Sequence, residues 1–188
     1  GWLSWKFNNV VLKLKLYYYF LLFFLLSCKS TEIIQLDKKS ALAGHNPCEP
    51  SICINPNDTD NILAAAIIDK YYYTKNGGKK WKMGKLESSY GVYGDPVVIA
   101  DTIGHFYYLH LSDPTGKNWK SEELLDRIVC QKSTDGGETF DDGTYIGFNH
   151  PKDQDKHWAV VDPASNTIYV SWTQFDKYGS KDTADKSN

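Results

Sequence analysis

Three stretches of the chain share one pattern, in which an apolar run closes on Asn or Asp, turns through polar residues and returns as a second apolar run. The first runs cover residues 49–56, 95–101 and 156–162, and the returning runs cover residues 62–66, 106–109 and 168–172. The closing residues, Asn55, Asp101 and Asp162, are 46 and 61 residues apart, so the repeat length varies. Short runs rich in Val, Ile and Tyr with turn residues between them predict antiparallel β-hairpins.

A second feature repeats inside this pattern. Residues 74–81 (TKNGGKKW) and 133–140 (STDGGETF) begin 59 residues apart, and each follows a predicted strand, at 71–73 and 127–130. Both place a hydroxyl, an Asn or Asp, two glycines and an aromatic in the same order. The Asn or Asp side chain can accept hydrogen bonds from backbone amides, and glycine adopts positive φ readily. Each segment is therefore predicted to be a hairpin turn between a third and a fourth strand.

Both segments resemble the Asp box, Ser/Thr-x-Asp-x-Gly-x-Thr-Trp/Phe, of bacterial sialidases (neuraminidases) and related β-propellers. The second copy matches in full, through Ser133, Asp135, Gly137 and Phe140. The first copy, with Thr74, Asn76, Gly78 and Trp81, departs by Asn76 in place of Asp and Lys80 in place of Thr. The resemblance implies an all-β fold, a β-propeller of four-stranded antiparallel blades. It also implies that the box is a structural turn at the edge of each blade, away from the active site.

About two and a half blades fit into residues 48–188, with the first at about 48–88, the second at about 95–147 and the third starting near 156. Propellers close with roughly four to eight blades, so this stretch is expected to be an incomplete ring from the N-terminal part of a longer protein. A β-sandwich is the alternative, although a sandwich has no use for a recurring box.

The first 28 residues are expected to be a signal peptide. Three lysines precede an apolar run over 16–26 that is short for a membrane span. The run ends in Leu-Leu-Ser-Cys, which resembles the lipobox of bacterial lipoproteins, and this implies a lipid anchor on Cys28 at the outer membrane, the cell surface or the periplasm. The alternative is an ordinary signal peptide with an incidental cysteine. Residues 29–47 are polar and predict a tether.

Charge and cysteine content exclude several other classes of protein. The net charge of -2, with scattered basic residues, gives no reason to expect a nucleic-acid partner. Cys48 and Cys53 are the closest pair for a disulfide, but an odd number of cysteines remains after Cys28. Because Cys53 and Cys130 lie in apolar strands, buried free thiols are the preferred interpretation. The cysteine spacing does not fit a metal site.

Candidate chemistry gathers where the first strand of each unit begins. Glu49, Asp95 and the 155–157 segment, with Asp155 and His157, occupy equivalent or nearby places. Such carboxyl groups could bind a cation such as calcium, although no cofactor is assignable, or hold a proton for general acid catalysis. The plainer alternative is that they accept turn hydrogen bonds. Tyr93, in an aromatic loop before Asp95, could stack on a sugar ring or only pack.

The family resemblance implies a sialidase, with an aspartate acid/base, a tyrosine nucleophile and three arginines that clamp the substrate carboxylate. Asp95 is our candidate acid/base. Arg127 is the only arginine in the chain, it lies on a predicted third strand, and Glu49 stands where the first clamp arginine belongs. Two hypotheses follow, a sialidase-like glycoside hydrolase acting on glycoconjugates, and a non-catalytic propeller that binds glycan or protein at the cell surface. An assembly or scaffold role is a third.

Overall fold

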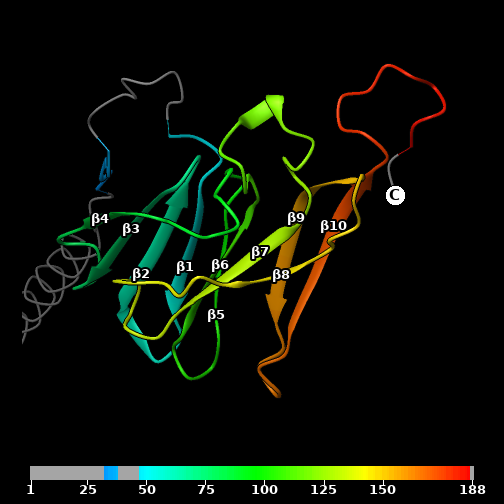
Figure 1. Ribbon diagram of the computed structural model, residues 1–188. Helices are drawn as coiled ribbons and strands as arrows, with labels where there is room; N and C mark the ends of the chain where they lie inside the picture. Colours follow the sequence, from blue (N-terminus) through cyan, green and yellow to red (C-terminus); the bar gives the residue numbers. More distant parts are fainter. Residues whose placement is uncertain (1–31, 38–46, 187–188) are drawn as a thin grey trace, which may run out of the picture. The chain divides into compact units, whose positions relative to one another are not determined.

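The computed structural model describes residues 32–37 and 47–186 (Figure 1). Contacts divide the chain into two compact units, Gly1–Gln35 and Leu36–Asn188, and all the described strands belong to the second. The predicted signal peptide, the anchor residue Cys28 and most of the tether lie outside the described residues. Among the residues described, no helix has the length and apolarity that crossing a membrane requires.

Two four-stranded antiparallel sheets and one pair of strands form the described part of the chain (Figure 1). The first sheet contains β1 (Ser51–Asn55), β2 (Asp58–Ala66), β3 (Lys70–Lys75) and β4 (Lys82–Lys85). The second contains β5 (Val97–Ala100), β6 (Phe106–Leu111), β7 (Ile128–Ser133) and β8 (Thr144–Ile146), and the pair is β9 (Asp153–Val161) with β10 (Ile168–Phe175). A short 3-10 helix, η1 (Asn118–Lys120), lies in the loop before β7. The predicted all-β class and the predicted strand order are confirmed.

Strands adjacent in the sequence are adjacent in both complete sheets, as the hairpin pattern predicts. The first strands also lie beside one another, because β5 contacts β1 and β9. Among the described residues the sheets do not close into a ring.

The second sheet is buried on both faces. Alternate side chains of β6 point to opposite sides of the sheet, so Phe106 and Tyr108 join one apolar cluster while Leu109 and Leu111 join another. The first cluster includes Leu63 and other side chains of the first sheet, and the second includes Ala159 and other side chains of β9 and β10. The two clusters therefore fix the second sheet between its neighbours in the chain.

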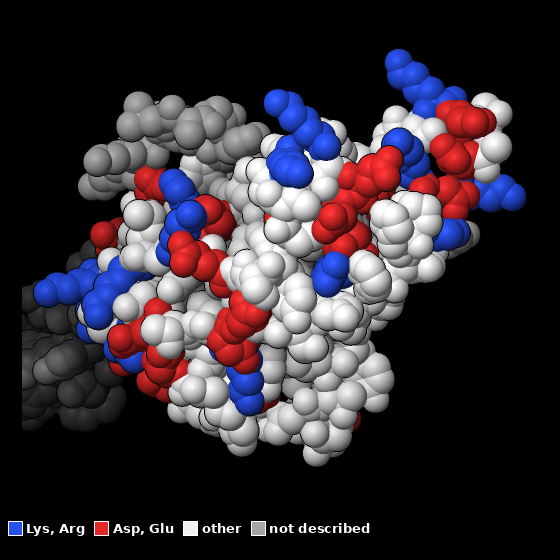
Figure 2. Space-filling view, viewed as in Figure 1, with Lys and Arg blue, Asp and Glu red and all other residues white. Residues whose placement is uncertain are grey.

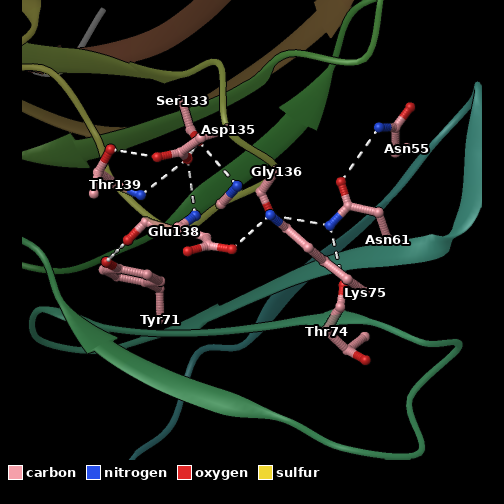
Figure 3. Close-up of polar contacts among 11 residues, drawn as sticks. Asn55, Asn61, Tyr71, Thr74, Lys75, Ser133, Asp135, Gly136, Glu138 and Thr139 are labelled. Atoms are coloured by element: carbon pink, nitrogen blue, oxygen red, sulfur yellow. Dashed lines mark hydrogen bonds and ion pairs between the residues drawn. The ribbon is translucent and has the colours of Figure 1, made fainter.

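In the complete box, residues 133–140, the Asp side chain accepts hydrogen bonds from backbone amides, as predicted. The Asp135 carboxylate accepts hydrogen bonds from the backbone amides of Glu138 and Thr139, both at 3.0 Å, and from the Ser133 hydroxyl at 2.8 Å (Figure 3). The Ser133 hydroxyl in turn accepts the amide of Gly137 at 2.9 Å. Gly136 and Gly137 have φ of 80° and 89°, values that strain other residues. The turn is thus held by its own side chains.

The incomplete box folds in the same way. Thr74 Oγ1 donates to Asn76 Oδ1 at 2.9 Å and accepts the Gly78 amide at 3.2 Å, while the Lys80 amide donates to Asn76 Oδ1 at 2.8 Å. Asn76 therefore replaces Asp in its acceptor role. The aromatic at the end of the box, Trp81, packs beside Gly78 and against Tyr72 and its apolar neighbours.

The complete box of the second sheet also joins the first sheet. The buried Asn61 side chain on β2 donates to the carbonyls of Thr74, at 3.0 Å, and Gly136, at 2.9 Å (Figure 3). The Tyr71 hydroxyl donates to the carbonyl of Glu138 at 2.9 Å, and the Phe140 ring meets the Tyr71 ring edge-on at 5.1 Å. The box thus makes contacts between sheets as well as within one.

The turns that end the first strands are also linked to one another. Asn57, after β1, donates to the Thr102 carbonyl at 2.6 Å. Thr102, after β5, donates through its amide and hydroxyl to Asn166, after β9, at 2.9 and 2.7 Å. Equivalent turns of the three units therefore form one chain of hydrogen bonds.

The three described cysteines are free thiols. Cys48 is exposed, whereas Cys53 and Cys130 are partly buried. Burial raises the pKa of the Cys130 thiol to about 12. Cys53 and Cys130 are free thiols, as predicted, but they are only partly buried, and Cys48 and Cys53 do not form a disulfide in this structure.

Candidate functional site

A backbone irregularity recurs where each first strand begins. Glu49, Asp95 and Lys156 have φ of 52°, 49° and 51°, in the left-handed region that non-glycine residues rarely adopt. The carbonyl before each of the first two accepts an equivalent hydrogen bond, from Ile67 to Cys48 at 3.0 Å and from Leu111 to Gly94 at 3.1 Å. Strained residues of this kind cluster at functional sites.

The third copy of this irregularity is a β-bulge. The pairing of β9 with β10 shifts register between Ser171 and Thr173, opposite Lys156. Asp155 pairs with Thr173 next to this shift. Asp155 directly precedes Lys156, just as Cys48 and Gly94 directly precede Glu49 and Asp95 and accept a hydrogen bond from a neighbouring strand. Bulges re-aim side chains and are frequent beside active sites.

The side chains of the three left-handed residues meet, although they come from three different sheets. Lys156 Nζ lies 2.8 Å from Asp95 Oδ2, and the carboxyl groups of Glu49 and Asp95 lie close enough to shift each other's pKa. Burial raises the pKa of Asp155, and the charge of Asp95 raises it further. Asp95 is therefore the centre of the group, which we call the acid cluster: Glu49, Asp95, Asp155 and Lys156.

Within the acid cluster the pKa values of Glu49 and Asp95 shift in opposite directions. The hydrogen bond with Asp95, assisted by burial, raises the pKa of Glu49. Burial acts to raise the pKa of Asp95 as well, but the hydrogen bonds with Glu49 and Lys156 and the charge of Lys156 outweigh it and lower that pKa. These opposite directions make Glu49 the weaker acid of the pair and Asp95 the stronger one.

His157 lies behind the acid cluster. Its side chain is 4% exposed, and neither ring nitrogen has a hydrogen-bond partner. Burial lowers the pKa of His157, while the Leu109 backbone and the negative charge of Asp95 oppose this shift.

Tyr93 is fixed by its neighbours rather than free in solvent. Its hydroxyl donates to Asn118 Oδ1 at 2.5 Å, and its ring meets Trp119 edge-on with 6.1 Å between ring centres. The half-buried Tyr93 therefore positions the loop that carries η1. That loop lies at the end of the sheets where β1, β5 and β9 begin, because β6 runs antiparallel to β5.

Comparison with known proteins identified no relative: no protein-family model, no curated protein and no solved structure matches this chain. The residues themselves therefore carry the functional argument.

No group of three or more His, Cys, Asp or Glu side chains within residues 32–37 and 47–186 is arranged to hold a metal ion. The acid cluster includes Lys156, whose ammonium group occupies the space beside Asp95 that a cation would take. The cluster as it stands is therefore suited to proton transfer or hydrogen bonding.

Arg127 is paired with its neighbour Asp126. Its Nε and Nη2 donate to the two carboxylate oxygens of the buried Asp126 at 2.7 and 2.5 Å. Its guanidinium also lies over the rings of Phe148, Tyr145 and Tyr90, at 4.5, 4.8 and 5.4 Å. Arg127 precedes β7, which begins at Ile128. This arginine therefore supports the loop before β7.

Sequence reasoning missed two parts of this end of the molecule. The role of Lys156 depends on a bulge that has no clear signal in the sequence, although an acidic residue before proline marks the other two copies at Glu49 and Asp95. The exposed aromatic pair Trp119 and Tyr178 comes from two loops that no pattern links.

Proposed function

We propose that the three units are successive blades of a β-propeller, and that the protein is a sialidase-like glycoside hydrolase acting on glycoconjugates. The placement of equivalent residues supports the propeller. The first strands lie side by side, the turns after them form one hydrogen-bonded chain, and the left-handed residues before them meet in the acid cluster. A common rotation that relates each unit to the next produces such equivalences at both ends of the sheets.

Two open apolar faces also favour a propeller. Trp158, Val160 and Tyr169 are exposed on β9 and β10, and Ile52 and Ile54 are exposed on β1. Tyr169 pairs with Val160, so these side chains of the strand pair share one face. Further blades would cover both faces in a closed ring.

The ion pair of Lys156 with Asp95 at 2.8 Å, beside the carboxyl group of Glu49, is the observation that carries the catalytic proposal. A glycosidase needs a carboxylic acid that protonates the leaving oxygen. Asp95 and burial raise the pKa of Glu49, which suits Glu49 to give a proton to a glycosidic oxygen, while Lys156 helps to lower the pKa of Asp95. In this proposal Glu49 is the acid and Asp95 positions it.

Non-catalytic binding of glycan or protein is the second candidate. The observation that favours it is the pairing of Arg127 with Asp126, because this pair uses the Nε and Nη2 donors that would otherwise clamp a substrate carboxylate. Glu49 occupies the place where the resemblance requires the first clamp arginine.

We further propose that the protein is exported and anchored through a lipid on Cys28. Expression of the full chain with a fatty-acid label should modify the wild-type protein and leave Cys28→Ala unlabelled. Equal labelling of both would contradict the anchor.

Turnover of a panel of aryl glycosides tests the catalytic proposal. The panel should include a sialoside, neutral hexosides and N-acetylhexosaminides, and the full chain should be compared with Glu49→Gln and Asp95→Asn. Loss of the acid should lower kcat by about a hundredfold or more. Asp58→Asn, at the opposite end of the sheets, is the matched control. Folded protein that turns over no glycoside, yet binds glycan equally in both variants, would favour the binding role.

A further inference from the structure

A pocket of about 510 Å³ lies at the same end of the sheets as the acid cluster. One side is the loop that carries η1, which comes from the second sheet, and the other is the segment that follows β10. The amide of Gln154 on β9 donates to the Leu125 carbonyl at 2.7 Å and holds the two sides together. Pockets between units, with apolar lining and a few polar groups, are the usual sites for small ligands.

An exposed aromatic pair forms part of this pocket. The rings of Trp119 and Tyr178 stack with 5.8 Å between centres and 25° between planes, and they are 62% and 40% exposed. The Tyr178 amide donates to Asp153 Oδ2 at 2.7 Å, and Phe175 meets the Tyr178 ring edge-on at 5.3 Å. Both rings are therefore held in place while their surfaces stay open to solvent.

The charged groups that line the pocket are mainly carboxylates, which accept hydrogen bonds, and negative charges outnumber positive ones. Four carboxyl side chains and two lysines line it, and acidic side chains are visible over the segment after β10 (Figure 2). Two of the carboxyl groups belong to Asp153, which accepts the Tyr178 amide, and to Asp176, which pairs with Lys152 Nζ at 2.8 Å. Carboxylates accept hydrogen bonds from hydroxyl groups and repel anions.

We propose that this pocket is a binding subsite for an uncharged sugar ring, which stacks on Trp119 and Tyr178 and donates its hydroxyl protons to Asp153 and Asp176. The apolar face of a sugar ring matches a flat aromatic surface, and the negative surplus disfavours a carboxylated sugar such as sialic acid. Tyr93 connects the two places, because its ring contacts Trp119 and it precedes Asp95 by two residues. The subsite therefore holds the sugar next to the one at the acid cluster, and this assignment rests on the proposed action on glycans.

Saturation-transfer NMR and calorimetry with lactose, chitobiose and 3′-sialyllactose test the subsite on the full chain. We expect lactose or chitobiose to bind, and Trp119→Ala or Tyr178→Leu to weaken that binding about tenfold. Trp119→Phe should retain most of it, which separates stacking from a loss of folding. Trp158→Ala is the control, since Trp158 is 64% exposed on the open face of β9.

Two results would overturn the inference. These are no binding of either neutral disaccharide, or unchanged binding in Trp119→Ala. Turnover of glycosides, which Glu49→Gln should lower, distinguishes failure of the subsite from failure of the proposed function. Disaccharide binding that depends on Trp119 without turnover in the wild type removes only the hydrolase, and turnover with binding independent of Trp119 removes only the subsite.

Discussion

At the scale of single residues, one acceptor side chain organises each repeated turn. Asp135 accepts two backbone amides and two hydroxyls, whereas Asn76 accepts one amide and one hydroxyl through a single oxygen. Burial acts to raise the pKa of Asp135, but the hydrogen bonds from Thr139 and Ser133 outweigh it and lower that pKa. The complete box should therefore depend more strongly on its acid than the incomplete one does on its amide.

Removal of this acceptor gives the first prediction. Asp135→Ala should lower the free energy of unfolding by about 1–2 kcal/mol, as the loss of a capping side chain does. Asp135→Asn keeps one acceptor oxygen and should lose less. Urea denaturation followed by tryptophan fluorescence measures both. A loss in Asp135→Ala no larger than that in Asn76→Ala would contradict the unequal roles.

At the scale of elements, side chains that join the sheets matter as much as the strands. Asn61 lies on β2 of the first sheet, and its amide reaches the carbonyl of Gly136 in the second, 75 residues away in the sequence. Because Asn61 is buried, no water replaces it readily when it is removed.

We predict that Asn61→Ala lowers the free energy of unfolding by about 2–3 kcal/mol, since it leaves two carbonyl oxygens without a donor. Asn57→Ala is the comparison. It removes a single hydrogen bond at the turn after β1, in a more exposed place, and should lower the free energy of unfolding less. Chemical denaturation of both variants measures these free energies of unfolding. Equal decreases in the two variants would show that the contact between β2 and the box is unimportant.

How far the sequence predicts the elements depends on the range of the interactions. The boxes and the turns at Asn55, Asp101 and Asp162 are predictable because their hydrogen bonds lie within a few residues. The ion pair of Lys156 with Asp95 spans 61 residues and requires a bulge, so composition and spacing do not reveal it. The stacking of Trp119 on Tyr178 depends in the same way on where two loops meet.

At the scale of the whole molecule, burial of the second sheet on both faces places titratable groups in its interior. His110 on β6 is fully buried, with Nδ1 2.8 Å from the Leu111 carbonyl and Nε2 3.0 Å from Gln131 Oε1. Burial lowers the pKa of His110 to about 4 from an ordinary 6.5, and these two contacts oppose the shift only in part.

This burial predicts a loss of stability in mild acid. Below pH 6.5 His110 binds a proton in the unfolded chain, whereas in the folded protein it binds one only near pH 4. The stability of the fold is therefore full above pH 6.5 and decreases as the pH falls. The wild type should lose about 2 kcal/mol between pH 6.5 and about pH 4.5. His110→Gln should show a shallower dependence in urea titrations over this range. The same slope in both proteins would contradict it.

The central claim is that three sheets bring Glu49, Asp95 and Lys156 together in one site, where Asp95 raises the pKa of Glu49. An NMR titration of the Glu49 carboxyl group tests it most directly, in the wild type and in Asp95→Ala. We predict a pKa above the ordinary 4.5 in the wild type and a return toward 4.5 in the variant, because the Asp95 hydrogen bond is the largest cause of the shift. A pKa of about 4.5 in the wild type, unchanged by Asp95→Ala, would contradict the account.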